Sequence, residues 1–166
     1  MGNSFPRRKA IRLPQCDYTS VGAYFITVCV KDRQPLLWDH VGAGITRPED
    51  APLSAWGKTV AAAIGQISEH YPHITVEKYC IMPDHLHLLL QFHDTDGRQV
   101  AAPTLSTVVG QMKRWVSKTT GVSFWQKSFI DRVIRSEAGY LAVWEYIDNN
   151  PLQLDNGDEL PDLSQL

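Results

Sequence analysis

Two strand-like runs that are separated only by Pro83-Asp84 constrain the fold of this chain most tightly. Residues 74–82 and residues 85–92 are rich in β-branched, aromatic and aliphatic side chains, which favour strands. A proline followed by an aspartate between two such runs is typical of a tight turn. We therefore expect these two runs to form an antiparallel hairpin.

A strand and a helix are expected before this hairpin. Residues 23–30 are apolar almost throughout and contain aromatic and β-branched side chains, which predicts a strand buried on both faces. Ser54 is a favourable helix cap, and apolar side chains recur at helical spacing from there to about His70. The polar segment between them, residues 32–50, is expected to be a loop.

A second helix, a strand and a third helix are expected after the hairpin. Thr104 or Ser106 begins the second helix, and Gly121 ends it. A strand lies within residues 124–134, and residues 137–149 show a helical pattern. The first six elements match the split β-α-β order. The expected fold is therefore α+β: a ferredoxin-like split β-α-β sandwich, with an antiparallel sheet, helices on one face and one more helix near the C-terminus.

The charges divide the chain into a basic body and an acidic end. Its 166 residues suit one globular domain, and the net charge is −2. Residues 1–135 contain 16 basic and 11 acidic side chains, whereas residues 136–166 contain seven acidic side chains and no basic one. We therefore predict one domain over residues 1–152 and an acidic tail over residues 153–166, which competes with nucleic acid for the basic surface.

Cysteine content and hydropathy indicate the compartment. Three cysteines without a Cys-x-x-Cys pair give no sign of a disulfide framework or a zinc ribbon. The apolar runs are too short to span a bilayer, and the first residues lack the apolar core of a signal peptide. A soluble, cytoplasmic protein is the expectation.

His85 and His87 are the sharpest local feature of the sequence. Side chains alternate between the faces of a strand, so both imidazoles point to one face while Leu86 points to the other. Two imidazoles on one face can bind a divalent cation, although a metal site needs at least one further ligand. The alternative is that the two histidines lie on a half-exposed sheet surface.

The third expected helix can supply the further ligand. Tyr146 and Asn150 are four residues apart and share a helix face, and the amide oxygen of Asn150 is a hard ligand. Tyr140, Trp144 and Ile147 are expected to form the stripe that packs on the core, which places Tyr146 away from the core. The alternative is a tyrosine at the core edge whose hydroxyl contacts water.

Basic and aromatic side chains are interleaved in the sequence. Phosphates bind basic side chains and unpaired bases stack on aromatic rings, so this pattern favours single-stranded nucleic acid as a partner. A solvated charged surface, with the aromatic residues in the core, is the alternative. The candidate nucleic-acid ligands are Arg7, Arg8, Lys9, Arg12, Lys113, Arg114, Lys118, Lys127, Arg132, Arg135, Trp115 and Trp125.

Four motifs in a fixed order resemble those of one protein family. The sequence is similar to the single-tyrosine HUH transposases (IS200-like), and within them to the REP-associated tyrosine transposases, over nearly its whole length. The motifs are Tyr18-Thr19-Ser20 with Gly22-Ala23-Tyr24-Phe25-Ile26-Thr27, Ile81-Met82-Pro83-Asp84-His85-Leu86-His87, Phe124-Trp125-Gln126 with Val133-Ile134-Arg135, and Tyr146-Ile147 with Asn149-Asn150-Pro151.

The resemblance implies a role for each residue of the candidate site. His85 and His87 correspond to the metal-binding histidines and Tyr146 to the nucleophile. Asn150 corresponds to the helix-borne third ligand, which binds the ion directly or through water. Asp84 replaces an asparagine that is frequent in relatives, and we interpret it as turn-forming.

The resemblance also implies a reaction. Such an enzyme cleaves and rejoins single-stranded DNA with Mg²⁺ or Mn²⁺, through a 5′-phosphotyrosine intermediate, on hairpins formed by REP-type palindromes. It acts as a monomer or as a homodimer. Two alternatives stay open at this point: a catalytically silent relative that only binds DNA or RNA, and a metal hydrolase that uses the histidine pair on small molecules.

Overall fold

The computed structural model describes residues 21–41, 44–45, 47–94 and 103–153. None of the helices in these ranges is long and apolar enough to cross a membrane. Some sequence-based predictions lie outside the described residues and stay predictions, namely those for Arg7, Arg8, Lys9, Arg12 and residues 154–166 of the acidic tail.

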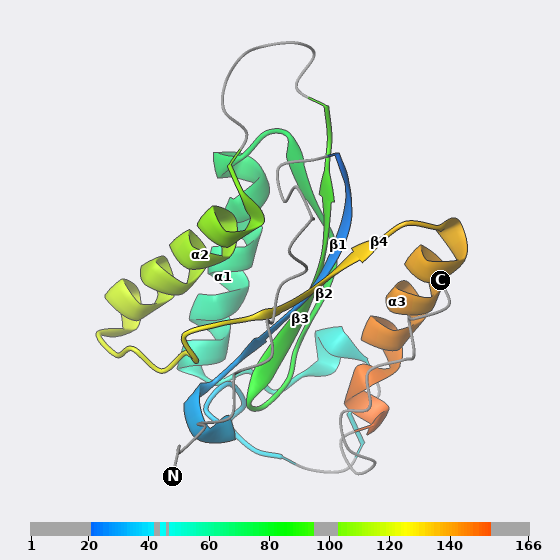
Figure 1. Ribbon diagram of the computed structural model, residues 1–166. Helices are drawn as coiled ribbons and strands as arrows, with labels where there is room; N and C mark the ends of the chain where they lie inside the picture. The colour runs from blue at the N-terminus through cyan, green and yellow to red at the C-terminus, as the bar shows by residue number, and fades with distance from the viewer. Residues whose placement is uncertain (1–20, 42–43, 46, 95–102, 154–166) are drawn as a thin grey trace, which may run out of the picture.

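Four antiparallel strands form one sheet in the order β2-β3-β1-β4 (Figure 1). They are β1 (Gly22–Cys29), β2 (Ile74–Ile81), β3 (His85–Phe92) and β4 (Ile130–Ile134). β2 and β3 pair directly with each other, so the expected hairpin is confirmed. β1 lies between β3 and β4. The helix after β1 leads to β2 and the helix after β3 leads to β4, and each of these connections passes over one strand of the sheet. The predicted α+β class with a ferredoxin-like split β-α-β order is therefore confirmed.

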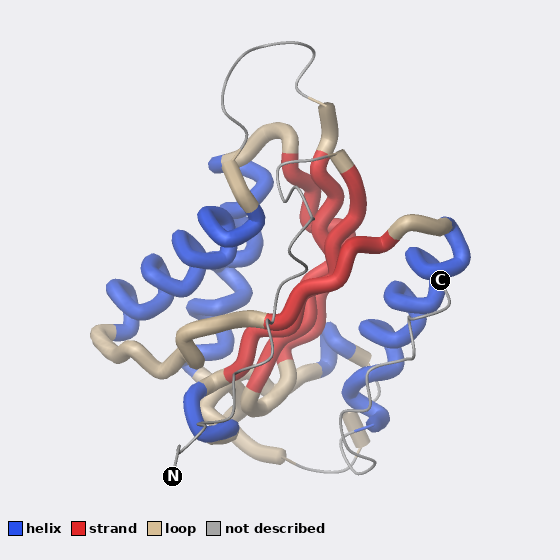
Figure 2. Tube along the Cα trace, in the orientation of Figure 1, coloured by secondary structure: helices blue, strands red, loops and turns tan. Residues whose placement is uncertain are grey.

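Helices α1 (Ala55–His70) and α2 (Leu105–Thr120) cover one face of the sheet (Figures 1 and 2). Both begin at the expected caps, because the hydroxyls of Ser54 and Thr104 each accept a hydrogen bond from a backbone N–H three residues further on. Gly121 ends α2 with a φ of 73°, a left-handed conformation that glycine adopts at little cost.

Helix α3 (Glu137–Asn149) lies on the opposite face of the sheet and packs against β2 and β3 (Figure 2). It begins at Ser136, whose hydroxyl accepts the N–H of Gly139, and it continues into the short 3-10 helix η3 (Asn150–Gln153). Among the described residues, two α-helices therefore cover one face of the sheet and one covers the other. The residues that α3 buries consequently meet the residues that β2 and β3 present to this second face.

The buried face of α3 differs from the predicted one. Val143 and Ile147 are fully buried and Tyr146 is 7% exposed, whereas Trp144 is 36% exposed. Tyr140 is half-buried. The expectation that Trp144 packs on the core and Tyr146 lies away from it is therefore wrong. The cause is that α3 packs over a sheet face with polar side chains, and a hydroxyl-bearing ring suits that face.

Trp144 finds its partners at the edge of the sheet instead. The Lys78 ammonium lies 4.5 Å from the centroid of a Trp144 ring, and it also forms an ion pair of 2.7 Å with Asp148. A cation beside an aromatic ring stabilises both groups without complete burial. These contacts tie the outer side of α3 to β2.

Gly57 lies where helix α1 closely approaches another backbone segment. A Cβ atom on Gly57 would lie 2.1 Å from the carbonyl oxygen of Leu37, and a backbone carbonyl cannot turn aside as the end of a flexible side chain can. We expect Gly57→Ala to lower the free energy of unfolding by roughly 1–3 kcal/mol, as measured by urea denaturation.

Gly65 provides a matched control in the same helix. Its Cβ position has no atom within 4 Å, so Gly65→Ala is expected to raise the free energy of unfolding by about 0.8–1 kcal/mol through helix propensity alone. Equal effects of the two substitutions would show that α1 does not approach Leu37 as closely as described.

Candidate functional site

Strand β3 presents two histidines to the face of the sheet that α3 covers. His85 is 2% exposed and His87 is 1% exposed. Their Nε2 atoms lie 3.2 Å apart, and their ring centroids are separated by 4.8 Å. The alternative of a half-exposed histidine surface is therefore wrong, because both imidazoles are buried with their Nε2 atoms facing each other.

Polar neighbours fix the orientation of both imidazoles. His85 Nδ1 lies 2.6 Å from Asp84 Oδ1, and because an ionised carboxylate only accepts, Nδ1 donates; in the neutral form of the ring this leaves the lone pair on Nε2. His87 Nδ1 lies 2.9 Å from the Oγ1 atom of Thr27, the β1 residue directly opposite it. Burial lowers the pKa of His87 well below its usual value, and the charges of His85 and Arg33 act in the same direction, so the His87 ring is neutral at pH 7.

Helix α3 places Tyr146 against this histidine pair. Tyr146 Oη lies 3.5 Å from His87 Nε2. Phe25 of β1 packs against both rings, since its centroid is 5.3 Å from that of His87 and 5.8 Å from that of Tyr146. A phenol oxygen and two imidazole nitrogens therefore converge in one buried region between α3 and the sheet.

Asn150 follows Tyr146 by four residues and forms the C-cap of α3. The residue is 1% exposed, and its Oδ1 atom has no hydrogen-bond partner. A buried amide oxygen without a partner is costly in free energy, and most such oxygens in proteins are satisfied. Asn150 Oδ1 is therefore available to a ligand at this end of α3.

The donor atoms suit a divalent cation. Two imidazole nitrogens that each lie about 2.1 Å from one ion are about 3.0–3.4 Å apart, for angles between a right angle and the tetrahedral angle. The separation of 3.2 Å between His85 Nε2 and His87 Nε2 falls in this range. Asn150 adds an oxygen donor, the type that Mg²⁺ and Mn²⁺ accept. No group of three or more His, Cys, Asp or Glu side chains within the described ranges could hold a metal. A metal site at the histidine pair therefore needs a ligand of another type, such as the asparagine oxygen.

The sequence interpretation missed several neighbours of the site. The sequence gives Thr27 and Phe25 no role at the histidine pair, although a threonine in an apolar strand is a usable signal. Asp84 was interpreted as turn-forming, but its Oδ2 atom also forms an ion pair of 2.8 Å with Arg33 Nε. Burial raises the pKa of Asp84, yet the hydrogen bond and charge of His85, together with Arg33, outweigh this effect and hold the pKa below its ordinary value.

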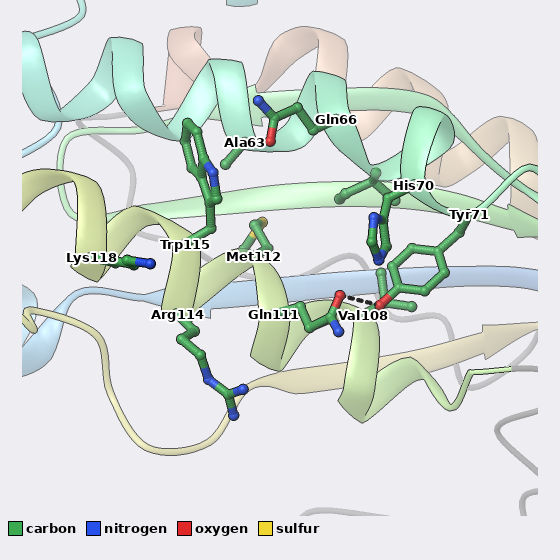
Figure 3. Close-up of a pocket in the computed structure, with 11 residues that line it drawn as sticks. Ala63, Gln66, His70, Tyr71, Val108, Gln111, Met112, Arg114, Trp115 and Lys118 are labelled. Atoms are coloured by element: carbon green, nitrogen blue, oxygen red, sulfur yellow. Dashed lines mark hydrogen bonds between the residues drawn. The ribbon is translucent and has the colours of Figure 1, made fainter.

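Part of the predicted nucleic-acid surface lines a groove between α1 and α2 (Figure 3). The groove and α3, which carries Tyr146, lie on opposite faces of the sheet. The groove has a volume of about 300 Å³ and is lined by Arg114, Trp115 and Lys118. Figure 3 shows the Trp115 ring extending from α2 toward α1, and the hydrogen bond between Tyr71 and Gln111 at the other end. None of the described lining residues is acidic, so the groove is electropositive.

Two other predicted nucleic-acid ligands have contacts within the protein. Lys113 Nζ donates to the carbonyl oxygens of Gln126 and Ser128 at 2.8 and 2.9 Å, which holds the segment before β4 against α2. Burial lowers the pKa of Lys113 to about 8. Trp125 is 8% exposed and forms an isolated β-bridge with Val30. Both residues therefore stabilise the segment before β4, whether or not they also contact nucleic acid.

The remaining basic candidates lie on or beside β4. Arg132 is the β4 partner of Phe25, and directly opposite residues of paired strands point to the same face. Because Phe25 stacks on His87, Arg132 is placed on the face that carries the histidines. Lys127 and Arg135 are exposed in the segments that flank β4. A contact of any of these residues with nucleic acid stays a prediction.

Comparisons with known proteins bear on the family. No family model matches the chain. An uncharacterised protein of Haemophilus influenzae is 29% identical over 165 residues, which cover 87% of this chain and 88% of that protein. A second protein of Haemophilus influenzae, provisionally named a REP-associated tyrosine transposase, is 27% identical over 147 residues, which cover 82% of this chain and 74% of that protein. The chain is therefore similar in sequence to a REP-associated tyrosine transposase over most of its length.

A solved structure shows the same fold. A solved structure of a REP-associated tyrosine transposase bound to a REP hairpin matches with a TM-score of 0.64 and 19% identity, over 86% of this chain and 73% of that chain. The chain therefore shares its fold with this protein, and its sequence is similar to that of a protein of the family that the four motifs resemble. The roles of Tyr146, His85, His87 and Asn150 stay predictions, and the structure brings the first three together.

Proposed function

We propose that this protein is a REP-associated tyrosine transposase and that it cleaves and rejoins single-stranded DNA through Tyr146. The observation that carries the proposal is the convergence of Tyr146 Oη with the Nε2 atoms of His85 and His87 between α3 and the sheet. A nucleophile beside a pair of metal-binding side chains is the arrangement that metal-assisted covalent catalysis requires.

In the proposed reaction, Tyr146 Oη attacks the phosphorus atom of the scissile phosphodiester. A bond forms between phosphorus and the tyrosine oxygen, and the bond to the 3′ oxygen breaks, which gives a 5′-phosphotyrosine and a free 3′-OH. The phenol loses a proton and the leaving oxygen gains one. Because one phosphodiester bond replaces another, no external energy source is required. Attack of a 3′-OH on the phosphotyrosine then rejoins a strand and restores the phenol.

Mg²⁺ or Mn²⁺ is the proposed cofactor. His85 and His87 would hold it through their Nε2 atoms, and Asn150 through Oδ1, either directly or through a water molecule. When bound, the ion supplies positive charge that stabilises the scissile phosphate and the leaving oxygen. A phenol has an unperturbed pKa of about 10, so a tyrosine nucleophile needs such positive charge beside it at pH 7.

Substrate access requires a rearrangement around α3. Tyr146 is 7% exposed and the two histidines are 2% and 1% exposed, so a phosphodiester cannot reach them in the described arrangement. α3 is the only described α-helix on this face of the sheet, so we expect it to be the element that shifts. We propose that DNA binding moves α3 away from the sheet and opens the site.

The proposed substrate is DNA that carries a hairpin of the REP type. The similar solved structure is of a protein bound to a REP hairpin, and this chain shares its fold. The groove between α1 and α2 combines the cations of Arg114 and Lys118 with the ring of Trp115. Cations that bind phosphates beside a ring that stacks on bases suit DNA with unpaired nucleotides.

Removing the two cations of the groove is expected to weaken DNA binding in a salt-dependent manner. In the variant Arg114→Gln/Lys118→Gln, the slope of log affinity against log salt concentration should become shallower by about 1–2. Fluorescence anisotropy with a labelled hairpin at several salt concentrations measures this slope. Lys58→Gln, which removes an exposed lysine of α1 that does not line the groove, is the control and should leave the slope nearly unchanged. An unaltered slope in the double variant would place the DNA elsewhere.

The proposed function is tested by covalent capture. The chain is incubated with a single-stranded hairpin oligonucleotide and Mn²⁺, and the products are separated under denaturing conditions. We expect a protein–DNA adduct together with a fragment that ends in a 3′-OH, and we expect neither product after chelation of the metal. DNA binding without any adduct would instead favour a catalytically silent DNA-binding relative.

A further inference from the structure

A chain of three polar side chains leads from the protein surface to the buried histidine pair. The Arg33 Nε atom lies 2.8 Å from Asp84 Oδ2, and the other carboxylate oxygen, Oδ1, lies 2.6 Å from His85 Nδ1. The exposed fractions of the side chains decrease along the chain, from 43% for Arg33 to 22% for Asp84 and 3% for His85. Asp84 therefore uses both oxygens at once, one for a guanidinium and one for an imidazole.

The backbone before Arg33 adopts an unfavourable conformation that brings its side chain to Asp84. Asp32 and Arg33 have φ angles of 56° and 53°, within the short 3-10 segment η1 (Lys31–Arg33). Two successive non-glycine residues in the left-handed region are uncommon, and such outliers persist only where the surroundings hold them. Arg33 Nη1 also donates to Cys29 Sγ at 3.1 Å, so the guanidinium joins the end of β1 to the β2–β3 turn.

The turn that carries Asp84 is itself held by backbone hydrogen bonds. The N–H of Val30 donates to the Asp84 carbonyl oxygen at 2.8 Å, and the N–H of Leu37 donates to the Pro83 carbonyl oxygen at 2.9 Å. Both donors come from the segment that follows β1. The carboxylate of Asp84 is thus placed by a fixed backbone, and its rotamer is fixed by Arg33.

We infer that Asp84 and Arg33 are positioning residues for His85 as a metal ligand. Asp84 accepts the Nδ1 proton of His85, which holds the tautomer whose Nε2 lone pair faces His87. Arg33 fixes the direction of the Asp84 carboxylate, because the Arg33 Nε–H group donates to Asp84 Oδ2. The inference rests on the proposed metal-dependent function and assigns to two further residues a role in metal binding.

The geometry predicts a particular effect of asparagine at position 84. With Arg33 present, the only acceptor of the asparagine amide has to face the guanidinium, so its NH₂ group turns toward His85 Nδ1. His85 then carries its proton on Nε2, where a metal would bind. Asp84→Asn should therefore weaken metal binding at least as strongly as Asp84→Ala does. Removal of Arg33 frees the amide to turn and to offer its oxygen to His85, so Arg33→Ala/Asp84→Asn should bind metal more tightly than Asp84→Asn alone.

Mn²⁺ binding to the full chain without DNA tests this inference, by isothermal titration calorimetry and by electron paramagnetic resonance of free Mn²⁺. We expect Asp84→Ala and Asp84→Asn to weaken Mn²⁺ affinity by roughly 10–100-fold, the usual effect of losing a carboxylate behind a metal-binding histidine. Asp148→Asn is the matched control, since it removes a carboxylate that pairs with Lys78 rather than with a histidine. Its affinity should stay within about twofold of wild type, because Asp148 does not contact the pair.

The outcomes separate this inference from the proposed function. A wild-type chain that binds no Mn²⁺ would overturn the metal-dependent function, and the inference with it. Mn²⁺ binding in wild type that is unchanged in Asp84→Ala and Asp84→Asn would overturn the inference alone. If Asp84→Ala does not fold, the comparison of Asp84→Asn with Arg33→Ala/Asp84→Asn decides: tighter binding by the double variant supports the inference, and weaker or equal binding contradicts it.

Discussion

Tyr146→Phe is expected to abolish the covalent protein–DNA adduct, with a loss of more than about 1,000-fold in the rate of its formation. The substitution removes the oxygen atom that forms the bond to phosphorus and keeps the ring that packs against Phe25 and His87. Removing the nucleophile of a covalent mechanism leaves only the rate of a different and slower attack. The measurement is adduct yield against time with a hairpin oligonucleotide and Mn²⁺, and thermal unfolding confirms that the variant is folded.

Tyr140→Phe is the matched control, because Tyr140 is the other tyrosine of α3. Its hydroxyl donates to Glu77 Oε2 at 3.2 Å, on the β2 side of the helix. Burial raises the pKa of Tyr140, and the charge and hydrogen bond of Glu77 raise it further, so this phenol is a poorer nucleophile. We expect wild-type adduct yield from Tyr140→Phe. An adduct that survives in Tyr146→Phe and disappears in Tyr140→Phe would reverse the assignment.

The sequence determined the strands, helices and caps well because their signals are local. The Pro83-Asp84 pair between two strand-like runs leaves a hairpin as the simple solution, and the structure has β2 and β3 on either side of it. Ser54 and Thr104 cap their helices through contacts that span three residues, which a sequence pattern contains directly. The strand order then followed from the sequence of elements.

The side of α3 that is buried could not be obtained in the same way. Hydropathy placed Trp144 in the core, yet a tryptophan with a nearby lysine can remain at the surface, and that lysine comes from β2. Tyr146 is buried because the surface that α3 covers is formed by His87 and Phe25, which lie in two other strands. A helix stripe is therefore predictable from its own sequence only where the opposite surface is uniformly apolar.

The residues of the candidate site could be named from the sequence, but the residues that hold them in position could not. His85, His87, Tyr146 and Asn150 were named from motifs, because alternation in a strand and four-residue spacing in a helix each place two side chains on one face. The role of Arg33 is not predictable from the sequence, since Arg33 reaches Asp84 through two left-handed residues that no sequence pattern indicates. Contacts between segments fifty residues apart depend on the tertiary fold.

His87→Ala is expected to remove Mn²⁺ binding and adduct formation together, each by more than about 100-fold, because a direct ligand contributes more than the residues behind it. His93→Ala is the control: this histidine is exposed and contacts Thr75 rather than the site. Calorimetry with Mn²⁺ and the adduct assay measure the two losses. An adduct that forms at the wild-type rate in His87→Ala would contradict a metal bound by the histidine pair.

Chemical rescue then separates loss of the ligand from loss of the fold. His87 is stacked on Phe25 and meets the edge of Tyr146, with centroid distances of 5.3 Å in both cases, so alanine leaves a slot shaped for one imidazole ring. Millimolar imidazole is expected to enter that slot and to restore part of the adduct yield in His87→Ala. It should restore nothing in Tyr146→Phe, because no small ring can replace the oxygen that forms the covalent bond. Rescue in both variants, or in neither, would show that His87 does not act through its imidazole at this site.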